Sequence, residues 1–165
     1  MKTRKFPVAP LAVLFIGLVG CGGAPVTQES AVEQPSQTPV EVAAAYLDAM
    51  ESGDLEAAEA LFASQSSVFE SGGEEGTWQQ YREHHIGPEL DQIETFTTVR
   101  GEAEGQTSQD GSMAFVAWPI EYLIQLTDGR TIDSRGTVTF VMVVEGAEYR
   151  IRHLHWSSRR KPATD

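Results

Sequence analysis

The stretch "AAYLDAMESGDLEAAEALFA", residues 44–63, decides the fold class, because it encodes two short amphipathic helices with a sharp break between them. Its apolar and small residues recur at helical spacing, which indicates a face packed on a core. "SGD" at 52–54 ends the first helix and caps the second. Upstream, Thr38, Pro39 and Glu41 form a T-x-x-E capping box with proline at the first helical position. The sequence therefore predicts two consecutive helices, the first beginning at Pro39.

A third helix is expected a little further along the chain. Thr77 can cap the stretch "WQQYREHH", residues 78–85. Gly87 and Pro88 follow, and proline disrupts a helix interior because it lacks the backbone N–H group. We expect this helix to break at these two residues.

The second half of the domain is rich in β-branched and aromatic residues, which favour strands. Short turn signals separate the stretches, so neighbouring strands should pair antiparallel. Helices followed by such a meander predict an α+β fold with the helices on one face of a curved sheet. The expected strands are a short one at 66–71 and longer ones within 93–105, 112–126, 131–144 and 148–157.

The N-terminal segment has the pattern of a secretory signal peptide. Lys2, Arg4 and Lys5 precede the apolar run "PLAVLFIGLVG" at 10–20. That run is shorter than the roughly 20 apolar residues that a membrane-spanning helix needs. We therefore assign residues 1–20 to a signal peptide that is removed.

The four residues "LVGC", 18–21, resemble the lipobox of bacterial lipoproteins. The resemblance implies cleavage before Cys21 and its lipidation, which would anchor an extracytoplasmic domain to a membrane of the bacterial cell envelope. Cys21 is the only cysteine, so no intramolecular disulfide can form. Residues 21–38 are then the lipidated cysteine and a disordered tether rich in Gly, Pro, Gln and Ser. Residues 39–160 form the single folded domain.

Charge excludes one class of partner. The chain has a formal charge of −12, and removal of residues 1–20 leaves 9 basic and 24 acidic side chains, a charge of −15. A nucleic-acid-binding protein needs clustered Lys and Arg, and "RRK" at 159–161 is too short to supply them. We expect no nucleic acid partner and no electrostatic docking on anionic lipid.

Two histidines lie one residue apart in "RIRHLHWSS", residues 150–158. In a regular strand, residues i and i+2 share a face. The set with fewer charges should face the cavity under the sheet. We expect that side to hold Tyr149, Ile151, His153 and His155, and the opposite side to hold Arg150, Arg152, Leu154 and Trp156.

A His-x-His pair can bind a metal, transfer a proton or form a polar wall. A catalytic zinc normally needs a third protein ligand, for which Glu70, His84 and His85 remain open. The spacing fixes only two ligands, so we expect a polar cavity wall with no metal and no other cofactor.

The helix pair at 44–63 and the closing "YRIRHLHWSS" at 149–158 resemble the nuclear transport factor 2-like superfamily, and within it the SnoaL-like domains. The resemblance spans about residues 39–158. It implies a cone-shaped, cystatin-like α+β barrel, with about three N-terminal helices packed on a strongly bent antiparallel sheet. Such a barrel encloses a cavity between the sheet and the helices.

The resemblance implies a binding function in that cavity. We expect a small apolar or anionic organic ligand, or a partner protein, bound without catalysis and with no catalytic residues assigned. Two alternatives remain: an isomerase-, dehydratase- or cyclase-type enzyme using His-assisted proton transfer, and a structural module that forms a homodimer. The candidate cavity residues are His153, His155, Arg135, Tyr81, His84, Trp118 and Tyr122.

The lipobox generates a direct prediction. Cys21→Ser removes the sulfur that carries the lipid, so lipid labelling should vanish and the protein should leave the membrane fraction. Each buried CH₂ of an acyl chain contributes about 0.8 kcal/mol, and loss of the chains removes this binding entirely. Metabolic labelling with a fatty acid and membrane fractionation measure both effects. Retention of the variant in the membrane fraction would contradict the assignment.

Overall fold

The computed structural model describes residues 35–162. The predicted signal peptide, Cys21 and the predicted tether up to residue 34 lie outside the described residues. Within 35–162, none of the helices has the length and apolar character needed to cross a membrane.

The first helix, α1 (Pro39–Ser52), confirms the predicted start. The Thr38 hydroxyl accepts a hydrogen bond from the Glu41 backbone N–H, and the Glu41 carboxylate accepts one from the Thr38 backbone N–H. Gly53 ends α1 in a left-handed conformation, where its N–H bonds carbonyls of the last turn. Asp54 then caps α2 (Leu55–Glu59), which is shorter than expected because Phe62 already begins a strand.

The third helical segment does not break at Gly87 and Pro88, so this expectation was wrong. It runs as α3 (Trp78–Tyr81), a π-helical turn η1 (Arg82–Ile86) and α4 (Gly87–Leu90). The Gly87 N–H donates to the carbonyl of Arg82, five residues back. The proline follows this wide turn at the start of α4, a position where a missing N–H costs little.

The sheet has seven strands in the order β2-β1-β7-β6-β5-β3, with β4 also paired to β5. All pairs are antiparallel except β1 with β7, which is parallel. The sheet is therefore mixed and open, where a purely antiparallel sheet was expected. Its strands are β1 (Phe62–Glu70), β2 (Gly73–Gly76), β3 (Ile93–Arg100), β4 (Glu104–Thr107), β5 (Met113–Leu126), β6 (Thr131–Glu145) and β7 (Glu148–Arg160).

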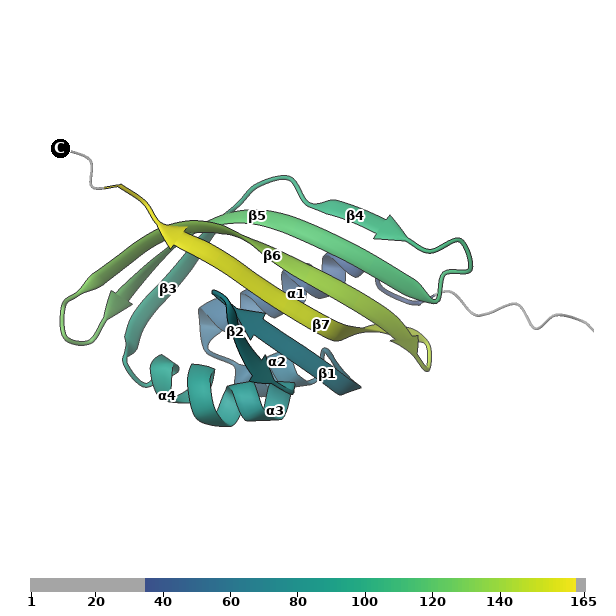
Figure 1. Ribbon diagram of the computed structural model, residues 1–165, viewed down its shortest axis with the longest axis horizontal. Helices are drawn as coiled ribbons and strands as arrows, with labels where there is room; N and C mark the ends of the chain where they lie inside the picture. The colour runs from purple at the N-terminus through teal and green to yellow at the C-terminus, as the bar shows by residue number, and fades with distance from the viewer. Residues whose placement is uncertain (1–34, 163–165) are drawn as a thin grey trace, which may run out of the picture. The chain divides into compact units, whose positions relative to one another are not determined.

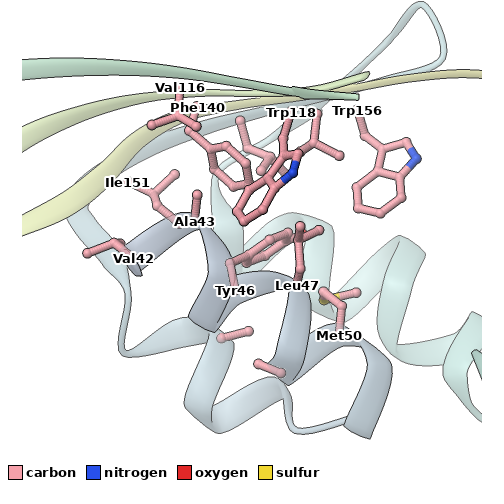
Figure 2. Close-up of a cluster of buried hydrophobic side chains, with 14 of the residues drawn as sticks. Val42, Ala43, Tyr46, Leu47, Met50, Val116, Trp118, Phe140, Ile151 and Trp156 are labelled. Atoms are coloured by element: carbon pink, nitrogen blue, oxygen red, sulfur yellow. The ribbon is translucent and has the colours of Figure 1, made fainter. Parts of the chain in front are cut away.

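The helices cover one face of this bent sheet, which we call the inner face (Figure 1). Tyr46 and Leu47 of α1 are fully buried there, and Figure 2 shows them directed toward the sheet. The Tyr46 ring meets Phe140 edge-on, with ring centroids 5.6 Å apart. Within residues 35–162 the opposite, outer face carries no helix (Figure 1).

A β-bulge in β7 changes which residues face the helices. Along β6, Met142 pairs with Ile151 and the next residue, Val141, pairs with His153. Arg152 is therefore one extra residue, and such an insertion inverts the alternation of side chains beyond it. Tyr149 and Ile151 face inward as predicted, but beyond the bulge the buried residues are Leu154 and Trp156.

The assigned faces predict losses of different size for two leucines, one on each face of the sheet. Leu154 is completely buried on the inner face, so Leu154→Ala should lower the free energy of unfolding by about 2–5 kcal/mol. Leu123 is 39% exposed, and Leu123→Ala should change it by only about 0.5 kcal/mol. Urea denaturation measures both values. Equal losses in the two variants would contradict the assigned faces.

Candidate functional site

A small cavity lies between the inner face of the sheet and the segment from α3 to β3. Its volume is about 50 Å³. One end is polar and the remaining walls are mainly aliphatic and aromatic. The lining residues are Met50, Glu70, Tyr81, Ile86, Glu89, Ile93, Phe96, Tyr122, Ile124 and Trp156.

Glu70 and Tyr81 form the polar end of this cavity. Glu70 is the last residue of β1 and pairs with Trp156 of β7, which places it on the inner face. The Tyr81 hydroxyl donates to the Glu70 carboxylate over 2.6 Å. Burial raises the pKa of Glu70, and the hydrogen bond from Tyr81 and the charge of His85 only partly oppose this. Burial also raises the pKa of Tyr81, so the phenol keeps its proton.

His85 of the π-helical turn lies beside this pair. Its Nδ1 is 2.9 Å from Glu75, and its Nε2 is 3.4 Å from Glu89 and 3.8 Å from Glu70. Desolvation alone lowers the pKa of His85, but the hydrogen bond to Glu75 and the surrounding carboxylates outweigh it and raise the pKa overall. The imidazole therefore favours the charged form in a group of three carboxylates.

Tyr46 adds a second phenol near Glu70. Its side chain is fully buried, and its hydroxyl has no hydrogen-bond partner among the described residues. Burial raises the pKa of Tyr46 far above its ordinary value, and the charge of Glu70 raises it further. Tyr46 is therefore a neutral donor whose hydrogen bond is still free.

His153 and His155 are on the outer face, not on the cavity side, so their predicted orientation was wrong. The bulge at Arg152 places them there. Both are half-buried, and Nδ1 of His153 lies 2.9 Å from the Ser67 hydroxyl. Burial lowers the pKa of His153, and His155 adds to this effect.

The other candidate residues also separate into two groups. Tyr81 and Tyr122 line the inner cavity, whereas Trp118 does not line it and donates its indole N–H to Gly101 over 2.9 Å. Arg135 is exposed on the outer face, and His84 is exposed on the π-helical turn. The expectation of one cavity shared by the histidines, Arg135 and the third helix was therefore wrong.

Sequence reasoning undervalued Glu70, which it considered only as a third metal ligand, and it did not select Tyr46. The sequence did contain a signal for Glu70: it lies two positions after the apolar Val68 in a strand, so the two side chains share a face. Within residues 35–162, no cluster of three or more His, Cys, Asp or Glu side chains has an arrangement that could hold a metal ion. The cavity offers a half-buried carboxyl and the Tyr81 phenol, and the Tyr46 phenol and the His85 imidazole lie near Glu70 outside the lining. These groups are suited to hydrogen bonding and proton transfer.

A bent sheet with helices over its inner face defines the nuclear transport factor 2-like, or cystatin-like, class of folds. The model of the SnoaL-like domain family matches residues 40–160, so this chain belongs to that family. Among curated proteins, none matches this sequence.

Solved structures with low sequence identity share the fold. A nuclear transport factor 2-like superfamily protein from Salmonella enterica is 21% identical, with a TM-score of 0.65, covering 74% of this chain and 89% of that one. A proposed ketosteroid isomerase from Shewanella frigidimarina is 21% identical, with a TM-score of 0.60, covering 71% and 92%. A cystatin-like protein from Caulobacter vibrioides is 18% identical, with a TM-score of 0.62, covering 73% and 87%. At these identities the comparisons establish the fold alone.

The raised pKa of Glu70 predicts a pH-dependent stability. Between the ordinary glutamate pKa of 4.5 and the higher folded-state pKa, the folded state holds a proton that the unfolded state has released. Stability therefore falls as the pH rises through that interval. The glutamine of Glu70→Gln cannot ionise, so the variant does not lose stability in this way. The free energy of unfolding of the variant should therefore increase relative to that of wild type as the pH rises from about 4 to about 8.

Urea denaturation across that pH range measures the difference. Glu104→Gln, at an exposed carboxylate of β4, is the control and should show no such trend. A difference between Glu70→Gln and wild type that stays constant with pH would contradict the prediction.

Proposed function

We propose that this SnoaL-like domain binds a small, mostly apolar organic molecule in the inner cavity, without catalysis, while lipidation at Cys21 holds it at the extracytoplasmic side of a bacterial membrane. The observation that supports this proposal is the hydrogen bond from the Tyr81 hydroxyl to the Glu70 carboxylate, 2.6 Å long. It lies at one end of a cavity whose other walls are mainly apolar. Ligand sites of small molecules have this composition, with a few polar groups fixing orientation.

The charge around the cavity selects a neutral ligand. Glu70, Glu75 and Glu89 lie close together and are offset by one imidazole. A carboxylate guest would be repelled here, and Arg135, which was expected to bind it, is on the outer face. A hydroxyl or carbonyl group fits, because the carboxyl and phenol can donate to it or accept from it.

The volume limits the size of the guest. A cavity needs about 10–15 Å³ to hold one water molecule, so about 50 Å³ accommodates a molecule of only a few heavy atoms. A larger ligand requires a wall to move. We expect the α4 wall, which contributes Glu89, to move, because α4 has no buried residue and is not part of the sheet.

A second candidate function is proton transfer of the isomerase type, and the half-buried Glu70 favours it. A carboxyl whose pKa is raised by burial is a stronger base at neutral pH than an ordinary one. The Tyr81 phenol lines the cavity and, once it turns its proton from Glu70 to the guest, is a donor for an oxygen that becomes negative as a proton leaves the neighbouring carbon. The catalytic base would then be Glu70 and not a histidine of β7.

Binding is tested with butanone, a small ketone with few enough heavy atoms for this volume. Titration should shift the indole N–H resonance of Trp156, which lines the cavity, in heteronuclear NMR spectra. Tyr81→Phe removes the hydroxyl that fixes the Glu70 carboxyl in the cavity and should weaken binding about three- to tenfold. Tyr149→Phe is the matched control, since that phenol bonds Gly111 elsewhere. No shift at Trp156, or equal weakening in both variants, would refute the proposed site.

The same samples in heavy water distinguish binding from catalysis. A proton-transfer enzyme exchanges deuterium into the carbon next to the carbonyl group faster than buffer does, and Glu70→Gln abolishes the excess rate. Binding with the buffer rate of exchange supports the non-catalytic function.

A further inference from the structure

A second hollow lies on the outer face, independent of the inner cavity. It has a volume of about 620 Å³, within the range of small-molecule sites. It lies where β3 ends against the middle of β5, and β6 and β7 continue its floor. The lining residues are Val99, Arg100, Gly101, Pro119, Ile120, Glu121, Arg135, Gly136, Thr137, Ser157, Ser158 and Arg159.

Two arginines lie side by side in the lining of this hollow. Arg135 of β6 and Arg159 of β7 are direct cross-strand partners, so their Cα atoms are about 5 Å apart. Like charges in such a pair destabilise a sheet. Within residues 35–162, neither guanidinium has an ion pair or a side-chain hydrogen bond.

Most other basic side chains of the described region have acidic partners. Glu121, the cross-strand neighbour of Arg135, is already bonded by Lys161 over 2.8 Å. Arg100 at the edge of the hollow is bonded to Asp48 and Glu51. Two positive charges therefore remain at this place in a chain with twice as many acidic as basic residues.

The floor and one wall add further binding groups. The exposed Ser157 and the half-buried Thr137 are cross-strand partners two pairs along from the arginines, on the same face, and their hydroxyls can donate to an anion. Gly136 lets β6 and β7 approach closely, since a Cβ there would lie 2.1 Å from the Ser157 carbonyl oxygen. Val99, 70% exposed, and Pro119 supply apolar surface.

We infer that this hollow binds a small organic phosphate monoester. Its dianionic head lies between Arg135 and Arg159, whose planar guanidinium groups match phosphate oxygens in bidentate geometry. Two negative charges neutralise the two unpaired arginines, and the organic part covers Val99 and Pro119. The overall negative charge of the chain opposes anions at long range, so the arginines supply the selectivity.

Calorimetry with phenyl phosphate on the full chain tests the site. One-to-one saturable binding is expected, and Arg135→Gln and Arg159→Gln should each weaken it about tenfold or more, the effect of losing a charge-assisted hydrogen bond. Arg130→Gln is the matched control: Arg130 lies at the β5–β6 turn, paired with Asp128 and outside the hollow. Its affinity should equal that of wild type. Tyr81→Phe should also leave it unchanged, which separates this site from the inner cavity.

Three results would overturn the inference. The first is no saturable heat. The second is equal weakening by Arg130→Gln, which would indicate unspecific attraction to positive charge. The third is self-association in sedimentation that Arg135→Gln abolishes and phenyl phosphate does not alter, because the occupant of the hollow would then be a second copy of the chain. If inorganic phosphate bound as tightly as phenyl phosphate, the hollow would recognise the phosphate group alone, and the proposal of an organic ligand would be wrong.

Discussion

The extra residue at Arg152 is the constraint on which both faces of the sheet depend. Before it, Tyr149 and Ile151 point to the helices, and beyond it Leu154 and Trp156 do so. Without the insertion, strict alternation would bury imidazoles in place of a leucine and a tryptophan. Burial of those two apolar side chains contributes roughly 1.5–3 kcal/mol each. The bulge therefore keeps the core continuous along a strand whose sequence changes its alternation.

Local signals in the sequence predicted the local structure well. The capping box at Thr38, the break at Gly53 and the start at Thr77 are interactions between residues three or four positions apart, and the structure forms all of them. The α+β class and the SnoaL-like resemblance followed from the order of these elements. The parallel pairing of β1 with β7 was missed because it joins residues more than eighty positions apart.

The candidate site was predicted less well, because it depends on register. Alternation placed both histidines of β7 inward, and a single inserted residue reversed them. The π-helical turn acts similarly on the third helix: Ile86 is buried where an uninterrupted α-helix would bury His85, one turn after Tyr81. Such insertions leave little trace in the sequence, since arginine in a strand and "REHH" in a helix are unremarkable residues. Tertiary packing selects them.

The structure separates two electrostatic environments with one layer of backbone. Under the sheet, carboxylates and neutral phenols surround an apolar cavity, which suits an uncharged guest. Above it, two unpaired guanidinium groups border an open hollow. Because adjacent residues of β5 and β7 belong to different faces, these two strands contribute side chains to both sites.

The two inserted residues also determine how this domain can diverge. A point substitution at Arg152 changes one side chain, but a deletion of that residue exchanges the surroundings of every later side chain of β7. A deletion within the π-helical turn would likewise rotate His85 relative to Glu70. When sequences with this fold are aligned, a one-residue deletion at either place therefore indicates that different side chains line the cavity. The percentage of identical residues does not reveal this difference.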